Sequence, residues 1–98
     1  MLNIVNKSPL ERDSLGACLR LAAPGAILLI EDAVYGAVRG TVVAARVQEA
    51  LGRFRIYALK ADLEARAVAD RVLDGVTVVD YGGFVDLVAE HRACQSWL

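Results

Sequence analysis

The sequence feature that most constrains the fold is an uninterrupted run of five aliphatic residues at positions 26–30. Pro24 and Gly25 precede this run, and Glu31 and Asp32 follow it. Because nothing polar interrupts the run, it predicts a strand that is buried on both faces, and such strands are typical of parallel sheets. The run is also far shorter than the ~18 residues that a membrane-spanning helix requires.

Further strands and helices are predicted on either side of this run. Three other segments have strand character, namely residues 2–6, 53–59 and 76–79. Amphipathic or apolar segments between them predict helices at residues 9–23, 42–51, 62–73 and 84–91, with one or two helical turns at residues 33–38. Residues 80–83 are expected to form a turn, and residues 92–98 a tail.

Two sets of residues indicate where helices begin. Ser8, Pro9 and Glu11 have the pattern of a capping box with proline in the first turn. Asp62 is expected to cap the helix over residues 62–73.

The alternation of strands and helices predicts βαβ units with right-handed crossovers. The expected fold class is therefore α/β, a three-layer α/β/α sandwich with a mainly parallel sheet of four to five strands. A length of 98 residues predicts that this fold forms one domain, residues 1–98.

Composition narrows the classes of function. The chain is 56% hydrophobic and 23% charged, which excludes an intrinsically disordered protein. Its 11 basic and 12 acidic residues nearly cancel, so no direct contact with nucleic acid or with a membrane surface is expected. The N-terminal residues lack the pattern of a signal peptide, and two cysteines are too few for a disulfide framework. A cytoplasmic location is therefore expected.

No catalytic motif is recognisable. Phosphate-binding glycine loops and the serine elbow of hydrolases are absent from the sequence. Gly82 and Gly83 are expected to form a tight turn. His91 and Cys94 supply only two of the four ligands of a zinc site, so no metal and no cofactor are expected. Residues 31–32 follow a predicted strand at the edge where α/β proteins bind ligands, and helix capping is their expected use.

Cys18 is the candidate residue for covalent chemistry. On a helix over residues 9–23 it shares an apolar stripe with Leu15, Leu19 and Ala22. Two roles remain open. The first is a buried structural thiol, because a buried cysteine usually behaves as a small hydrophobic residue. The second is a reactive thiol at an oligomer interface.

Five blocks along nearly the whole chain resemble the DsrH/TusB family of sulfur-relay proteins. They are residues 2–9, 28–35, 56–59 with 62–66, 79–87 and 95–97. The third block includes the sequence DLEAR at residues 62–66, and the fourth begins VDYGGFV at residue 79. Ala67 departs from the family pattern, which usually has glycine there. Inside the predicted helix this departure is expected to matter little.

The resemblance leans to the DsrH branch, because TusB members generally lack a thiol at the position of Cys18. It implies a DsrEFH-like fold and a subunit of a cytoplasmic heterohexamer with DsrE-like and DsrF-like (TusD-like and TusC-like) sister subunits. Such a complex carries persulfide sulfur in bacterial sulfur oxidation, and a downstream sulfur-carrier protein is a further expected partner. Cys18 is then a candidate persulfide site. The better-established acceptor cysteine of the family lies on a sister subunit, so this chain is expected to be a non-catalytic or auxiliary subunit.

Three alternatives stay open. The chain is a TusB-like subunit of a relay for 2-thiolation of the wobble uridine of tRNA, acting as a scaffold without sulfur chemistry of its own. Alternatively, it is an unrelated small-molecule binder that uses Glu31, Tyr35 and Tyr81 near the strand ends. Self-association of the isolated chain is also open.

Overall fold

The computed structural model describes residues 1–98, and its strands form one five-stranded sheet in the order β4-β3-β2-β1-β5. The strands are β1 (Leu2–Val5), β2 (Gly25–Leu29), β3 (Phe54–Leu59), β4 (Thr77–Val79) and β5 (Cys94–Trp97). Every neighbouring pair is parallel. The predicted α/β class and parallel sheet are confirmed, with the larger of the two expected strand numbers.

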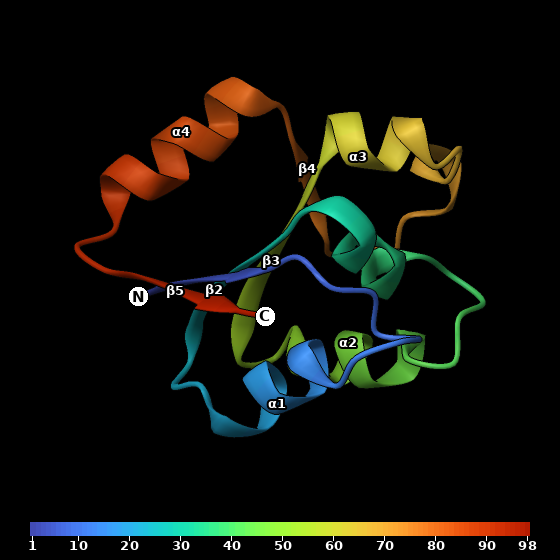
Figure 1. The fold of residues 1–98 in the computed structure, drawn as a ribbon, viewed down its shortest axis with the longest axis horizontal. Helices are drawn as coiled ribbons and strands as arrows, with labels where there is room; N and C mark the ends of the chain where they lie inside the picture. Colours follow the sequence, from blue (N-terminus) through green and yellow to red (C-terminus); the bar gives the residue numbers. More distant parts are fainter.

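Helical segments connect the strands and cover both faces of the sheet. They are α1 (Ser14–Leu21), η1 (Glu31–Ala37), α2 (Ala44–Ala50), α3 (Lys60–Ala65), η2 (Ala69–Arg71) and α4 (Tyr81–Glu90), where η marks a 3-10 helix. Figure 1 shows α1 and α2 together on one side of the sheet and α4 on the other. The three-layer arrangement follows from these positions. The longest of these helices, α4, has ten residues, and none is long and apolar enough to cross a membrane.

Strand β2 is buried on both faces because it contributes to two separate hydrophobic clusters. Ile27 and Leu29 point into a cluster of 18 buried residues beneath α1 and α2. Ala26 and Leu28 point the other way, into a smaller cluster that includes Leu87 of α4. Alternate side chains of a strand face opposite sides of its sheet, so a strand with helices on both sides is apolar throughout. The uninterrupted apolar run at positions 26–30 is therefore explained by the burial of β2 on both faces.

Helix α1 begins five residues later than predicted. The start at residue 9 is wrong because residues 8–12 close a turn of their own. The Ser8 hydroxyl accepts a hydrogen bond from the Leu10 amide at 3.2 Å, and the Ser8 carbonyl accepts one from the Arg12 amide at 3.0 Å. The capping-box residues therefore form a turn that precedes α1, whose first residue is Ser14.

Helix α3 is much shorter than the predicted helix over residues 62–73, and Ala67 marks the reason. Ala67 has φ +55°, in the left-handed region. Its amide donates to the Glu64 carbonyl at 3.0 Å, and the Val68 amide donates to the Leu63 carbonyl at 3.1 Å. This pair of bonds is a Schellman motif, which ends a helix at a left-handed residue that is usually glycine. The expectation that Ala67 lies inside a helix is therefore wrong.

The C-terminal part of the chain also differs from the prediction. Residues 80–83 are not a separate turn, because Asp80 caps α4 and accepts a hydrogen bond from the Gly83 amide at 2.8 Å. The expected tail over residues 92–98 contains strand β5, which pairs with β1 and places Trp97 opposite Val5. The predicted segments over residues 33–38 and 42–51 correspond to η1 and α2, shifted or shortened by at most two residues at each end.

Candidate functional site

Cys18 lies on the inward face of α1 and is 0% exposed. Leu15 and Leu19, which flank it on the same stripe, belong to the same 18-residue cluster. The helical periodicity left two roles open for Cys18, and its burial agrees with a buried structural thiol. Burial raises the pKa of the Cys18 thiol from its ordinary value of 9.0 to about 11, because a thiolate would lose its hydration there.

No basic side chain offsets the effect of burial on Cys18. Arg20, the nearest basic residue in sequence, points away from the core and donates to the Asp13 carboxylate at 2.8 Å. The thiolate is the nucleophilic form of cysteine. Burial and the raised pKa both disfavour the thiolate of Cys18 at neutral pH while α1 stays packed on the sheet.

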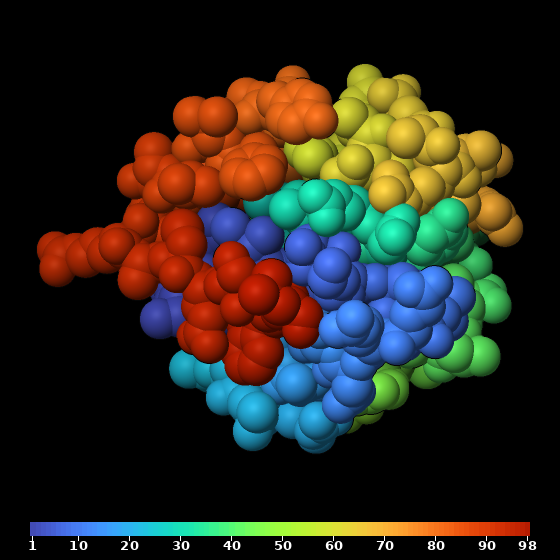
Figure 2. Space-filling model, viewed as in Figure 1, coloured from blue at the N-terminus to red at the C-terminus, as the bar shows by residue number.

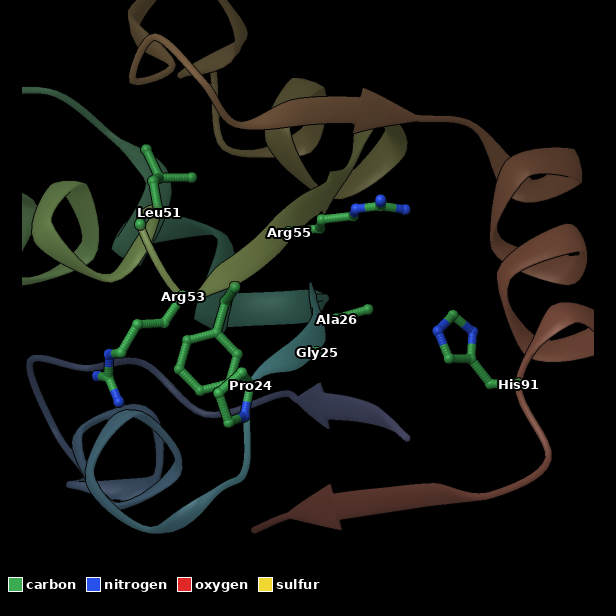
Figure 3. A pocket seen from close by; sticks show the side chains of 9 residues that line it. Pro24, Gly25, Ala26, Leu51, Arg53, Arg55 and His91 are labelled. Carbon is green, nitrogen blue, oxygen red and sulfur yellow. The ribbon is translucent and has the colours of Figure 1, made fainter.

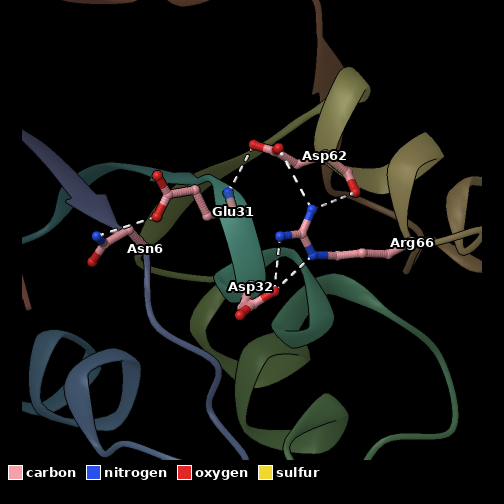
Figure 4. A network of polar contacts seen from close by, with 5 residues as sticks. All are labelled: Asn6, Glu31, Asp32, Asp62 and Arg66. Carbon is pink, nitrogen blue, oxygen red and sulfur yellow. Dashed lines mark hydrogen bonds and ion pairs between the residues drawn. The ribbon is translucent and has the colours of Figure 1, made fainter.

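The polar network shown in Figure 4 lies at the carboxyl ends of the strands, where a ligand site was considered. Arg66, the residue that follows α3, joins several of its members. Its guanidinium donates from Nε to Asp32 Oδ1 at 2.8 Å and from Nη1 to the Asp62 carbonyl at 3.1 Å. Asp62 Oδ2 accepts from the Glu31 amide at 2.7 Å, and the Asn6 amide donates to the Glu31 carboxylate at 3.4 Å.

This network connects β1, η1 and α3, and its contacts correct two predictions. Asp62 lies inside α3 and does not cap it. Instead, its carboxylate accepts the Glu31 amide at the beginning of η1. Residues 31–32 cap no helix through their own side chains, and the carboxylate of Asp32 forms an ion pair with Arg66 at 2.8 Å. Asp32 and Asp62 both pair with the Arg66 cation of the chain itself, so the network holds neighbouring elements together.

Comparison with known proteins gives the family. Residues 7–94 match the family model described as "DsrH like protein". The chain belongs to the DsrH/TusB family of sulfur-relay proteins. It is 37% identical to "Protein TusB" of Serratia proteamaculans over 99 residues, covering 99% of this chain and 100% of that one. It is 35% identical to "Protein TusB" of Photorhabdus laumondii, with the same coverage of both chains.

Solved structures similar to this DsrH/TusB chain bear on the fold alone. The E. coli ychN protein superposes with a TM-score of 0.81 at 19% identity, covering 97% of both chains. The protein MTH1491 of Methanobacterium thermoautotrophicum, of unknown function, superposes with a TM-score of 0.68 at 21% identity, covering 97% of this chain and 95% of that one.

The names of the curated relatives bear on the branch of the DsrH/TusB family. The preference for the DsrH branch depended on the presence of Cys18. The relatives just described both carry the name TusB and match along their whole length. They favour the alternative, a TusB-like subunit, over the interpretation as a sulfur-oxidation subunit.

The second cysteine of this DsrH/TusB chain is accessible. Cys94 is exposed on β5, an edge strand, and forms no disulfide. The sequence predicted a tail over residues 92–98 and so did not show that Cys94 lies beside β1 in the sheet, opposite Leu2. Cys94 and His91 belong to no group of three or more His, Cys, Asp or Glu side chains that could hold a metal ion.

The residues of the small-molecule alternative are not assembled into a site. Tyr35 packs against the larger hydrophobic cluster, whereas Tyr81 is exposed on α4. None of the four cavities of the molecule is lined by Glu31, Tyr35 or Tyr81. The geometry gives no support to a ligand site built from these residues.

Proposed function

We propose that the chain is a TusB-like subunit of a sulfur-relay complex in the bacterial cytoplasm, where it assembles with TusC-like and TusD-like sister subunits. In this complex it is a scaffold without sulfur chemistry of its own. The relay ends in 2-thiolation of the wobble uridine of tRNA, and the chain itself does not contact the nucleic acid. Identity to TusB proteins along the whole length supports the placement in such a complex.

The burial of Cys18 is the observation that carries the scaffold role. To accept sulfur, a thiolate must attack the outer sulfur of a donor persulfide, and so it must be both ionised and accessible. Cys18 is 0% exposed, and its pKa is raised to about 11. Both properties oppose the attack.

Helix α4 supports assembly with another subunit. Tyr81, Val85 and Val88 are exposed apolar side chains at helical spacings of four and three residues. At about 100° per residue they form one stripe, beside the face through which Leu87 contacts the sheet. An amphipathic helix that lies on one sheet needs no second apolar face. The α4 stripe, defined by these three residues, is therefore our proposed contact with a sister subunit.

The competing function is a persulfide carrier in bacterial sulfur oxidation, with Cys18 as the carrier. The two functions differ in the fate of sulfur on this chain. We would mix the chain with a persulfide-loaded TusD-like subunit and measure the intact mass of each chain. Cys94→Ser is the background for this experiment, because the exposed Cys94 thiol is free to take up sulfur adventitiously.

A scaffold forms the complex and gains no sulfur mass in the Cys94→Ser background. A gain of sulfur mass that the further change Cys18→Ala abolishes would make Cys18 a carrier. The tRNA outcome is measured separately in a bacterium that lacks its own TusB. The chain and its Cys18→Ala variant should both restore 2-thiouridine, and a variant that assembles but fails to restore it would contradict the scaffold role.

A further inference from the structure

A basic cavity lies at the opposite end of the sheet from the polar network. It has a volume of about 470 Å³ and is located where β2 and β3 begin. Gly25, Ala26 and Gly52 are among its lining residues, and they leave it open because they carry little or no side chain. Its volume lies within the ~300–1,000 Å³ range of small-molecule sites.

The permanently charged groups of this cavity, Arg53 and Arg55, are both positive. Arg53, Arg55 and His91 line it, and none of its nine lining residues is acidic. Neither Arg53 nor Arg55 forms an ion pair, whereas Arg20 and Arg66 both do. The positive charge that gathers in the basic cavity is therefore not neutralised by the chain itself, and such a cavity attracts anions.

Arg53 is held in place on one side of the cavity. Its Nη2 donates to the Leu19 carbonyl at 3.0 Å, and its guanidinium carbon lies 5.2 Å from the centre of the Phe54 ring. A guanidinium has five N–H donors, so most of the Arg53 donors stay available. Figure 3 shows Arg55 extending from β3 in the other direction, toward His91.

His91 is oriented by the end of α4. Its Nδ1 lies 2.7 Å from the Leu87 carbonyl, which can only accept a hydrogen bond, so Nδ1 carries a hydrogen and donates it. The other ring nitrogen, Nε2, is left for a ligand. In Figure 3 the imidazole reaches from α4 toward Ala26 and the guanidinium of Arg55. Nε2 donates to an anion oxygen when the ring is protonated and accepts from a ligand hydroxyl when it is neutral.

We propose that the basic cavity binds an oxyanion of the phosphate class, with Arg55 and His91 as its direct contacts and Arg53 as a fixed positive wall. Guanidinium groups match the oxygen spacing of phosphate and bind it bidentately. A hydrogen phosphate also offers both the acceptor oxygens that Arg55 needs and a hydroxyl that neutral His91 can accept from. This site is independent of the sulfur-relay function.

The test is an NMR titration of the full chain, in which the backbone amide shifts of Gly25 and Ala26 are followed at constant ionic strength. Inorganic phosphate is the first probe and ribose 5-phosphate the second. We expect saturable shifts with phosphate. If ribose 5-phosphate binds more tightly than inorganic phosphate, the ligand is a phosphorylated small molecule. If ribose 5-phosphate binds equally or more weakly, the ligand is free phosphate. No saturable shift with either probe overturns the proposal.

Variants assign the binding to the cavity. Arg55→Gln and His91→Gln should each weaken binding about tenfold, as expected for loss of a hydrogen bond to a charged group. Arg71→Gln is the matched control, because Arg71 is exposed and lines none of the cavities. Thermal unfolding of each variant shows whether the fold is kept. Equal weakening by Arg71→Gln would make the binding a nonspecific effect of charge and would overturn the proposal.

Discussion

The indole Nε1–H of Trp97 donates a hydrogen bond to Oδ1 of Asn3 at 3.1 Å, across 94 positions of sequence. Asn3 is only 2% exposed, and its own Nδ2 donates to the Ala26 carbonyl at 3.2 Å. The two bonds link β5 to β1 and β1 to β2. Strand β5 is mostly exposed, and its last residue, Trp97, thus anchors it to the buried part of the sheet.

Trp97→Phe should reduce the free energy of unfolding by about 1–2 kcal/mol, because it leaves the buried Asn3 oxygen without a donor. For a chain of this size each kcal/mol corresponds to a fall of about 4–8 °C in the melting temperature. Thermal or urea unfolding measures both quantities. Leu98→Ala is the control, since Leu98 is exposed and its truncation should change little. A Trp97→Phe variant as stable as the wild type would show that the bond does not stabilise the fold.

The two thiols should differ strongly in their reaction with a thiol reagent at neutral pH. A pKa of about 11 in place of 9.0 lowers the thiolate fraction of Cys18 about 100-fold, and burial blocks access as well. Cys94 should react at once, and Cys18 only as the chain unfolds. Cys94→Ser should remove the fast phase and leave the slow one. A fast phase that survives Cys94→Ser would show that α1 opens readily.

The same shift gives the buried thiol a dependence on pH. The pKa of Cys18 in the fold, about 11, lies above its ordinary value of 9.0, so the fold favours the neutral thiol. This contribution to stability is complete below pH 9 and is lost as the pH rises from 9 through 11. In Cys18→Ala the fall in stability over this pH range should be smaller. Urea unfolding at several pH values measures the difference, and an equal fall in both chains would contradict it.

Periodicity and composition were sufficient for the parts of the fold that depend on burial. The apolar run in β2 and the inward position of Cys18 both follow from side chains that must leave water. Strand β5 has no such signal, because Gln95 and Ser96 are exposed and the strand is defined by pairing with β1. Pairing between segments more than 90 residues apart leaves no local pattern in a sequence.

The basic cavity was unpredictable for a similar reason. Arg53 and Arg55 belong to one strand, but His91 reaches them only through the fold, from the end of α4. The sequence offered one observable signal, the absence of acidic residues from positions 51–56. The beginnings of α1 and α3 were misjudged because capping patterns fit turns and helix interiors as well as helix starts. The end of α3 was missed because the left-handed residue that ends it is alanine, where glycine would have been the signal.

Ala67→Gly should stabilise the chain by about 0.5–1 kcal/mol. A residue with a Cβ costs about 1–2 kcal/mol in the left-handed region, and the greater flexibility of glycine in the unfolded chain offsets part of the gain. Ala67 has φ +55° at the end of α3, which is a physical reason for the glycine that the family usually has there. Urea unfolding measures the change.

Ala65→Gly is the matched control for Ala67→Gly. Ala65 is also exposed and is the last residue of α3. Glycine within a helix costs up to about 1 kcal/mol relative to alanine, so this variant should be less stable than the wild type. The same substitution two positions apart should thus have opposite signs, and destabilisation by both would contradict the helix end described here.

Val85→Lys should abolish or strongly weaken assembly with the sister subunits without unfolding the chain. Val85 is 65% exposed in the middle of the α4 stripe, and a charge buried unpaired in a subunit contact is costly. Co-purification and size-exclusion chromatography measure assembly, and thermal unfolding of the isolated chain measures stability. Glu90→Lys places the same side chain on the opposite side of α4 and should assemble normally. Normal assembly of Val85→Lys would exclude the α4 stripe from the contact, and the sister subunits would then bind another surface of the chain.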